Sequence, residues 1–393
     1  MSFLFKQRTS LSDVGVDDRR GSAHQGSVTV TPDKALRHSG VWACLRLRAD
    51  LVSTMPLDAF RRTSDGVQVE VTKPPVLVTP GGEKVDITDW LYASQFDLDR
   101  SGNTVGLITA TSGLKLPARI ELVPLSDVSV RGKGSEIVEW KIGQRTYTPE
   151  QVWHERQFVV SGVPLGLSPV AYAAMSIGGY LSAQQFALDW FANDVAPMGT
   201  LRHQTEENIS AKVARTMKDR FKEAVAGRDI FVTGSEWEWT PAAADASQAA
   251  FLDQMQFGLA DVSRFFGVPA DMIDAAGSSS SITYANITQR NLQLLIMNLG
   301  PAITRRERAL SRLLPRPQFV KFNTDAILRM DPASVVTSLK TEIDARMIAP
   351  SEARALRNRA PYTDDQIAEF DRLFGKGQQA PQQQMKAENG ATP

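Results

Sequence analysis

The sequence predicts an α+β fold in which long amphipathic helices accompany a body of short antiparallel strands. Short apolar runs separated by turn residues fill residues 105–160, and their short connections favour antiparallel pairing. Elsewhere apolar residues recur at helical spacing, as in Phe251, Met255 and Leu259. A third observation is the segment from Ile282 to Leu314, which is interrupted only at Gly300-Pro301. The chain is therefore predicted to join a strand-rich body to several long helices.

Composition is that of an ordinary soluble protein of two or three domains. The chain has 393 residues, of which 42% are hydrophobic and 22% are charged. Lys and Arg total 44 and Asp and Glu total 44, so any DNA contact is expected to be local. The single cysteine, Cys44, excludes an intramolecular disulfide and is expected in the core. No apolar run is long enough for the core of a signal peptide or for a membrane span. The protein is therefore predicted to function in a cytoplasm or in a particle assembled there.

The first part of the chain is predicted to be a polar arm followed by two helices and several strands. Residues 1 to about 30 are rich in Ser, Gly, Arg and Asp, which predicts a mobile arm. Thr31-Pro32 opens a helix that ends before Pro56. A second helix is predicted from Asp86 to Leu98, followed by a turn over 99–103. The best strands are Ile120–Val123, Val128–Val130, Ile137–Ile142 and Trp153–Val160.

The second half is predicted to place long helices around a small insert. Ser168-Pro169 opens a helix to about Asn193 that is interrupted at Gly178-Gly179, and a later helix covers Ser247–Phe266. The insert is predicted to hold a strand, a helix and a hairpin: Met198–Arg202, Ile209–Ala226, and Ile230–Thr233 with Trp237–Thr240. The chain is predicted to finish with a strand, two short helices and a disordered tail: Phe319–Asn323, Val335–Arg346, Ser351–Arg357 and residues 375–393.

A search for catalytic groups finds isolated residues and no constellation. Gly132-Lys133 lacks the Ser or Thr and the upstream glycine of a phosphate-binding loop, and the four histidines show no ligand spacing. The serines of 278–281 lack a Gly-x-Ser-x-Gly elbow. Asp97 and Asp99 are either a pair for Mg²⁺ or, as we favour, residues that flank a turn. The chain is therefore predicted to be no enzyme and to need no cofactor or metal.

Two further groups of residues each allow two interpretations. Trp237 and Trp239 share one face of a predicted strand, so they form either the core of a small domain or an apolar docking face. An arginine cluster after Gly300-Pro301 faces either a neighbouring subunit's acids or DNA phosphates, or it is a solvated helix face favoured by the helix dipole. Its members are Arg305, Arg306, Arg308, Arg312 and Arg316.

A series of short motifs resembles a known family in its order and spacing. The motifs are Val41-Trp-Ala-Cys44, Gly102-Asn103, Gly166-Leu-Ser-Pro169, Phe266-Gly-Val-Pro269, Tyr284-Ala-Asn286, Pro301, Phe322, Asp325, Arg329-Met-Asp331 and Ser351-Glu-Ala-Arg354. The family is the portal proteins of tailed bacteriophages, the head-to-tail connectors of siphovirus type, and the similarity covers roughly residues 35–360. The chain departs from the family at Ser351, where Asn is frequent, and in the polar segment before Gly102.

The resemblance implies a portal fold with an α/β wing, a two-helix stem, a small α/β clip insert, a long kinked channel helix and a helical crown. The first part of the chain would be a disordered arm at 1–32 and the wing at 33–167. The stem helices would lie at 168–196 and 244–268, with the clip at 197–243 between them. The remaining segments would be the channel loop and kinked helix at 269–318, a wing strand at 319–334, the crown at 335–374 and a disordered tail at 375–393.

The resemblance also implies a function in a virion. About twelve copies would form a ring at one capsid vertex, assembled in the host cytoplasm, through which double-stranded DNA passes without sequence specificity. The partners would be the terminase large subunit, the head-tail adaptor, and the major capsid protein or a scaffold. Two alternatives remain: another ring protein of the neck, which would usually be shorter, or a DNA-processing enzyme, which metal-dependent turnover of DNA by the pure protein would favour.

Residue roles follow from the same resemblance. An uncharged channel lining suits DNA that must slide, because each phosphate held by a cation would slow it. The residues expected to face DNA are Ser278, Ser279, Ser280, Ser281, Tyr284, Asn286, Gln289 and Arg290. The clip residues expected to dock partners are Lys212, Arg215, Lys218, Trp237 and Trp239. Arg305, Arg306, Arg308 and Arg312 are expected at a subunit interface or as channel charges.

Overall fold

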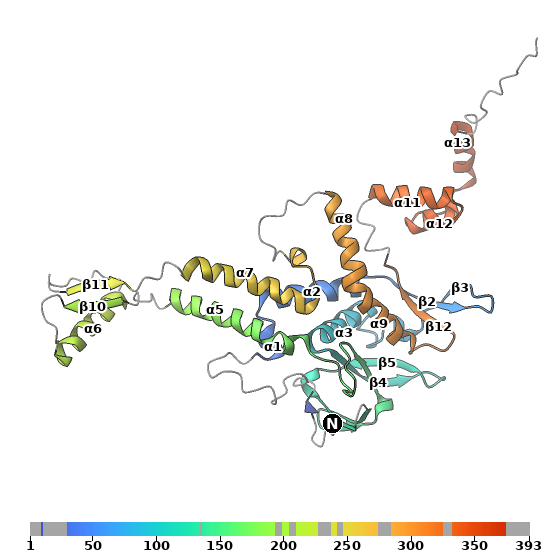
Figure 1. Ribbon diagram of the computed structural model, residues 1–393. Helices are drawn as coiled ribbons and strands as arrows, with labels where there is room; N and C mark the ends of the chain where they lie inside the picture. Colours follow the sequence, from blue (N-terminus) through green and yellow to red (C-terminus); the bar gives the residue numbers. More distant parts are fainter. Residues whose placement is uncertain are drawn as a thin grey trace, which may run out of the picture. The chain divides into compact units, whose positions relative to one another are not determined.

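A computed structural model describes nine stretches of the chain, and the molecule divides into two compact units, Met1–Ala326 and Ile327–Pro393 (Figure 1). The described residues are 9–10, 30–133, 136–192, 199–203, 210–226, 237–241, 247–273, 284–324 and 332–374. The mixture of long helices with small antiparallel sheets confirms the predicted α+β class.

Helices are spread along the whole chain. Those of the first unit are α1 (Pro32–Ala35), α2 (Ser39–Ser53), α3 (Ile87–Ser101), α4 (Pro169–Tyr172), α5 (Ala174–Ala192), α6 (Ala211–Ala226), α7 (Ser247–Phe266), α8 (Tyr284–Gln293), the π-helical segment η6 (Leu294–Leu299) and α9 (Gly300–Ser311). Those of the second unit are α11 (Pro332–Asp344), α12 (Pro350–Leu356) and α13 (Asp364–Phe374).

Every strand pair in the described residues is antiparallel. Short connections predicted this for the strands of residues 105–160. The sheets have the orders β5-β4-β9, β1-β6-β7-β8, β12-β2-β3 and β10-β11. The strands are β1 (Thr9–Ser10), β2 (Leu57–Arg62), β3 (Gln68–Val71), β4 (Asn103–Thr111), β5 (Pro117–Leu122), β6 (Val128–Lys133), β7 (Glu136–Ile142), β8 (Arg145–Tyr147), β9 (Val152–Arg156), β10 (Gly199–His203), β11 (Trp237–Pro241) and β12 (Gln318–Phe322).

Two strand predictions differ from the structure, and a third is not tested by it. Thr9 and Ser10, which fall in the predicted mobile arm, pair with β6; the rest of the arm up to residue 29 lies outside the described residues. The strand predicted to reach Val160 ends at Arg156, because Phe158 adopts a left-handed φ of 53° that turns the chain. Strand β11 pairs with β10, and its predicted hairpin partner, 230–233, lies outside the described residues.

The helix predicted from Thr31 to Met55 is two helices. His38 separates them, because its Nδ1 accepts hydrogen bonds from the Gly40 and Val41 amides and so caps the start of α2. Burial lowers the pKa of His38 to about 4, which leaves this nitrogen unprotonated and able to accept at neutral pH. Cys44 lies fully buried on α2, as predicted.

The main core of the first unit joins α2 to the helices on either side of the insert. Val41 and Leu45 of α2 pack with Ile177 of α5 and Val262 and Phe266 of α7. Helices α5 and α7 lie side by side (Figure 1). The break predicted at Gly178-Gly179 is wrong: the chain breaks before it, at Ala173, and α5 runs through both glycines. Glycine weakens a helix without ending it, so packing decides the outcome.

The long segment from Tyr284 to Ser311 stays helical through Gly300-Pro301, where a break was predicted (Figure 1). Its irregularity lies one turn earlier, in η6. Proline lacks an amide donor and its ring crowds the carbonyl of the preceding turn. The wider π-helical turn before Pro301 relieves that crowding, so the helix continues past the proline.

The motif glycines Gly102 and Gly166 form a close backbone contact next to the start of α4. Gly102 ends α3 with a φ of 76°, and a Cβ on it would lie 2.1 Å from the Leu167 carbonyl oxygen. The Asn103 side chain accepts from the Gly166 amide at 2.8 Å and donates to its carbonyl at 2.9 Å. Ser168 then caps α4 by accepting from the Ala171 amide. The two motifs therefore form one joint.

We predict that Gly102→Ala destabilises the protein by at least about 2 kcal/mol, because the side chain would meet the Leu167 carbonyl and force a non-glycine residue into the left-handed region. Urea unfolding followed by tryptophan fluorescence measures the change. Gly113→Ala is the matched control: a Cβ there meets nothing within 4 Å, so its effect should stay within about 0.5 kcal/mol. Equal unfolding midpoints for the two variants would contradict the joint.

Candidate functional site

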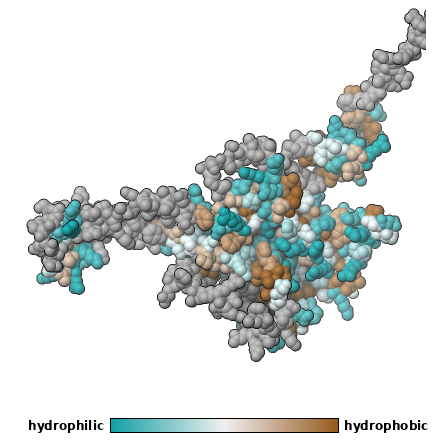
Figure 2. Space-filling view, in the orientation of Figure 1, coloured by the Kyte–Doolittle hydropathy of each residue, from teal (hydrophilic) through white to brown (hydrophobic). Residues whose placement is uncertain are grey.

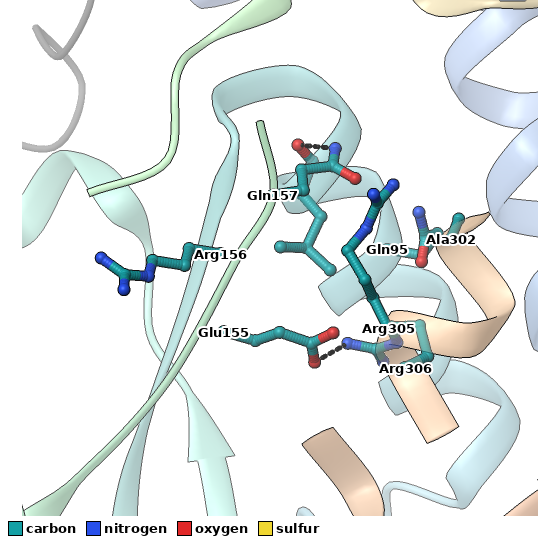
Figure 3. Close-up of a pocket in the computed structure, with 8 residues that line it drawn as sticks. Gln95, Glu155, Arg156, Gln157, Ala302, Arg305 and Arg306 are labelled. Carbon is teal, nitrogen blue, oxygen red and sulfur yellow. Dashed lines mark hydrogen bonds and ion pairs between the residues drawn. The ribbon is translucent and has the colours of Figure 1, made fainter. Parts of the chain in front are cut away.

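The long helix inserts one arginine into the body. Arg306 of α9 is 1% exposed, and its guanidinium donates to Glu155 Oε2 of β9 at 2.6 Å (Figure 3). It also donates to Ser94 Oγ of α3 at 2.6 Å. The same guanidinium lies 5.6 Å from the ring centre of Trp90. Burial raises the pKa of Glu155, and the positive charge of Arg306 opposes that shift.

A second buried ion pair lies next to the first. Arg48 of α2 donates from Nε to Asp99 Oδ2 of α3 at 3.1 Å, and both side chains are buried. Two glutamine amides, from Gln95 and Gln157, also donate to the Asp99 carboxylate, at 2.9 and 3.0 Å. Neighbouring charges and amides thus satisfy both carboxylate oxygens of Asp99. We call this set of buried groups the ionic cluster; its members are Arg48, Ser94, Gln95, Asp99, Glu155, Gln157 and Arg306.

The ionic cluster also binds the π-helical turn. Arg48 Nη1 donates to the Asn298 carbonyl at 3.2 Å, and Asn298 Nδ2 donates to the Gly267 carbonyl after α7 at 2.7 Å. These two hydrogen bonds fix η6 to α2 and to the end of α7.

Asp97 and Asp99 do not flank a turn, because α3 continues to Ser101. Residues two apart on a helix point to different sides. Asp97 pairs with Arg100, whereas Asp99 points into the ionic cluster. Burial raises the pKa of Asp97 to about 6, and Arg100 opposes the shift. The two carboxylates are therefore ion-pair partners of separate arginines and are not arranged as a pair for Mg²⁺.

The predicted channel residues fall at the start of the long helix. Ser278, Ser279, Ser280 and Ser281 lie outside the described residues, and Tyr284 and Asn286 occupy the first turn of α8. Gln289 is exposed. Arg290 is half-buried and pairs with Asp271 at 2.9 Å, in the 3-10 turn after α7. This ion pair joins α8 to the 3-10 turn that follows α7.

The predicted arginine cluster divides into two kinds of residue. Arg305 and Arg308 of α9, and Arg312 directly after it, are exposed. Arg306 is buried against Glu155 of the same chain, so it is unable to serve as an interface or channel charge. Helical geometry explains the correction, because neighbouring residues point about 100° apart and only one of them faces the body. A groove of about 830 Å³ runs beside α9, and its lining includes Arg305, Arg308 and Lys321.

The predicted clip residues lie on α6 and on β11. Lys212, Arg215 and Lys218 are exposed on α6. Trp237 is half-buried and packs edge-on against His203 of β10, with ring centres 5.0 Å apart. Trp239 lies opposite Leu201 in the strand register. The Trp237 ring therefore has at least one packing partner inside its own sheet.

The ionic cluster was missed in the sequence analysis. One signal was available: Arg48 follows Val41, Cys44 and Leu45 on the apolar face of α2, where a charge needs a buried partner. The identity of that partner was not readable, because Asp99 lies on a different helix, α3. Among the described residues, no three His, Cys, Asp or Glu side chains are grouped for a metal ion, and no helix there is long and apolar enough to cross a membrane.

Comparison with known proteins gives consistent matches. The family model described as phage portal protein matches residues 39–358. The probable portal protein of Streptomyces phage phiC31 is 26% identical over 373 residues, which are 88% of this chain and 79% of that protein. The portal protein of Enterobacteria phage HK97 is 24% identical over 367 residues, covering 88% and 85%. The chain belongs to the phage portal protein family.

Solved structures match the same fold. An HK97 family phage portal protein from Corynebacterium diphtheriae superposes with a TM-score of 0.59 at 19% identity, covering 78% of this chain and 100% of that one. A chain in the neck of a native gene transfer agent particle, computed with C12 symmetry, gives a TM-score of 0.54 at 16% identity and covers 90% of this chain and 100% of that one.

We predict that Arg306→Met destabilises the protein by about 3–5 kcal/mol, because it leaves the Glu155 carboxylate buried without its charged partner. Adding Glu155→Met should recover most of that loss, since the buried charge is then absent as well. Chemical denaturation of the single and double variants measures both effects. Arg308→Met, on the exposed face of the same helix, is the control and should change stability by less than about 0.5 kcal/mol. Additive losses in the double variant would contradict the pairing.

Proposed function

We propose that this chain is the portal subunit of a tailed phage or phage-like particle, and that about twelve copies close into a ring at one capsid vertex. Double-stranded DNA passes through the ring during packaging and ejection, in a virion assembled in the host cytoplasm. The match of the portal family model to residues 39–358 carries this proposal. Members of the family are structural proteins, so the alternative function of a DNA-processing enzyme loses its support. The family model also favours a portal protein over another ring protein of the neck.

The charge distribution supports a conduit in which DNA slides. The chain has no net charge, and the expected channel segment contains Ser278, Ser279, Ser280 and Ser281 in sequence. Lys or Arg on the lining would add affinity for each phosphate in turn and would slow translocation. Tyr284, Asn286, Gln289 and Arg290 extend this expected lining onto α8. The pairing of Arg290 with Asp271 supports such a lining, because it offsets the one cation.

The insert between α5 and α7 is the proposed docking site for partners. Its helix α6 exposes three basic side chains, Lys212, Arg215 and Lys218. We assign to this clip, with Trp237 and Trp239, the contacts with the terminase large subunit and later with the head-tail adaptor. The wing, made from α2, α3 and the three sheets of the body, would contact the major capsid protein or a scaffold. The exposed arginines Arg305, Arg308 and Arg312 would face the acids of a neighbouring subunit.

We predict that lysines at all four positions 278–281 leave ring formation unchanged and lower DNA packaging by at least about tenfold, because they would bind passing phosphates. Negative-stain class averages of the purified protein measure the ring, and protection of DNA from nuclease in a packaging reaction with terminase and ATP measures the function.

Four asparagines at the same positions are the control for this experiment, and they should package within about twofold of the unchanged chain, since they add no charge. Normal packaging by the lysine variant would contradict the channel assignment. A compact monomer or dimer for the unchanged chain, over a range of salt and concentration, would contradict the ring itself.

We predict that Lys212→Glu with Lys218→Glu weakens terminase binding by at least about tenfold while rings persist, since reversed charges at an interface repel the former partner. Binding of labelled terminase to purified rings, at two salt concentrations, measures the effect. Lys115→Glu with Arg145→Glu is the matched control, because both residues are exposed and lie in the body. Equal affinity for the two double variants would exclude these lysines from the docking surface.

A further inference from the structure

The second unit exposes most of its apolar side chains. Over residues 335–373, whose side chains are described, only Ala353 is buried. Met347, Ile367 and Leu373 are 76%, 47% and 60% exposed. Figure 2 shows apolar residues between hydrophilic ones on the surface of this unit. Three helices of this size need a core to be stable, so these apolar side chains need a covering partner.

Helix α13 presents its apolar residues as one stripe. Ile367, Phe370 and Leu373 recur every third position and therefore share a face. The Tyr362 ring packs edge-on against Phe370, with ring centres 5.2 Å apart. Tyr362 in turn lies under the Arg354 guanidinium of α12, 3.9 Å from the ring centre. These contacts set the start of α13, while Ile367 and Leu373 further along the stripe remain exposed.

Charge divides residues 345–374 of this unit, which follow α11, into a basic half and an acidic half. Residues 345–361 carry four arginines against a single glutamate, Glu352. Residues 362–374 carry four acidic side chains against a single arginine, Arg372. Arg354 is used inside the unit, where its Nε donates to the Ala360 carbonyl at 2.7 Å. Arg357 and Arg359 of the basic half, and Glu369 and Asp371 of the acidic half, are exposed.

We propose that α13 of one copy docks on the basic half, residues 345–361, of the next copy around the ring. The apolar stripe would cover Met347 and its neighbours, and the acidic flanks would lie against Arg357 and Arg359. A symmetric pairing of two α13 helices would instead place acid against acid. A head-to-tail contact repeats around a closed ring and leaves no stripe uncovered. This contact rests on the proposed ring, since it needs a second copy on each side.

Cysteine pairs in the full-length protein test the contact. Met347→Cys is combined with Ile367→Cys in one variant and with Leu373→Cys in another, and purified rings are oxidised. Cys44 does not interfere, because burial raises the pKa of its thiol to about 12. We expect at least one variant to form a ladder of covalent multimers on a non-reducing denaturing gel. Met347→Cys alone is the control that should give no ladder, because one exposed cysteine per copy can join no more than two copies.

Charge reversal in the cross-linking variant supplies a second readout that does not depend on disulfide geometry. Arg357→Glu with Arg359→Glu should lower the ladder yield at least about fivefold, and adding Glu369→Lys with Asp371→Lys should restore it to within about twofold. The contact would be contradicted if intact rings gave no ladder in either variant, or if charge reversal left the ladder yield unchanged. Neither result would contradict the portal ring. Failure of the unchanged chain to form rings would overturn the proposed function and this contact together.

Discussion

Arg306 places a full positive charge in the interior of the first unit, and a buried charge without a partner would cost several kcal/mol. Glu155 and Ser94 satisfy it, from a strand 151 residues away and a helix 212 residues away along the chain. Arg48 and Asp99 add a second pair that brings α2 into the same ionic cluster. Three helices and one strand are therefore fixed in one register, because each charge requires a partner from another element.

The long helix depends on this arrangement. Its π-helical turn accommodates Pro301 and is bound on one side by Arg48 and on the other by the segment after α7. Helix α8 also pairs with the 3-10 turn that follows α7, through Arg290 and Asp271. A body held by buried ion pairs can keep the long helix in place while the segment 274–283, between the two ends, is the expected contact with DNA.

The exposed surfaces complement the buried ones. Arg305, Arg308 and Arg312 remain on the outer side of the long helix although their neighbour Arg306 is buried. In the second unit, residues 345–361 are basic and residues 362–374 are acidic, and little apolar surface is buried. Both features suit a protein whose folding is completed by identical neighbours, since assembly covers apolar residues that a single copy leaves in water.

The sequence alone determined what depends on local pattern. Periodicity and end signals predicted most helices and strands, the antiparallel pairing and the burial of Cys44, and the order of short motifs identified the portal family. The pairing of β11 with β10 and the ionic cluster were decided only by the tertiary structure. Both depend on residues brought together from distant parts of the chain. A hydrophobic pattern records which face of an element is buried, but it does not record which charge will lie against that face.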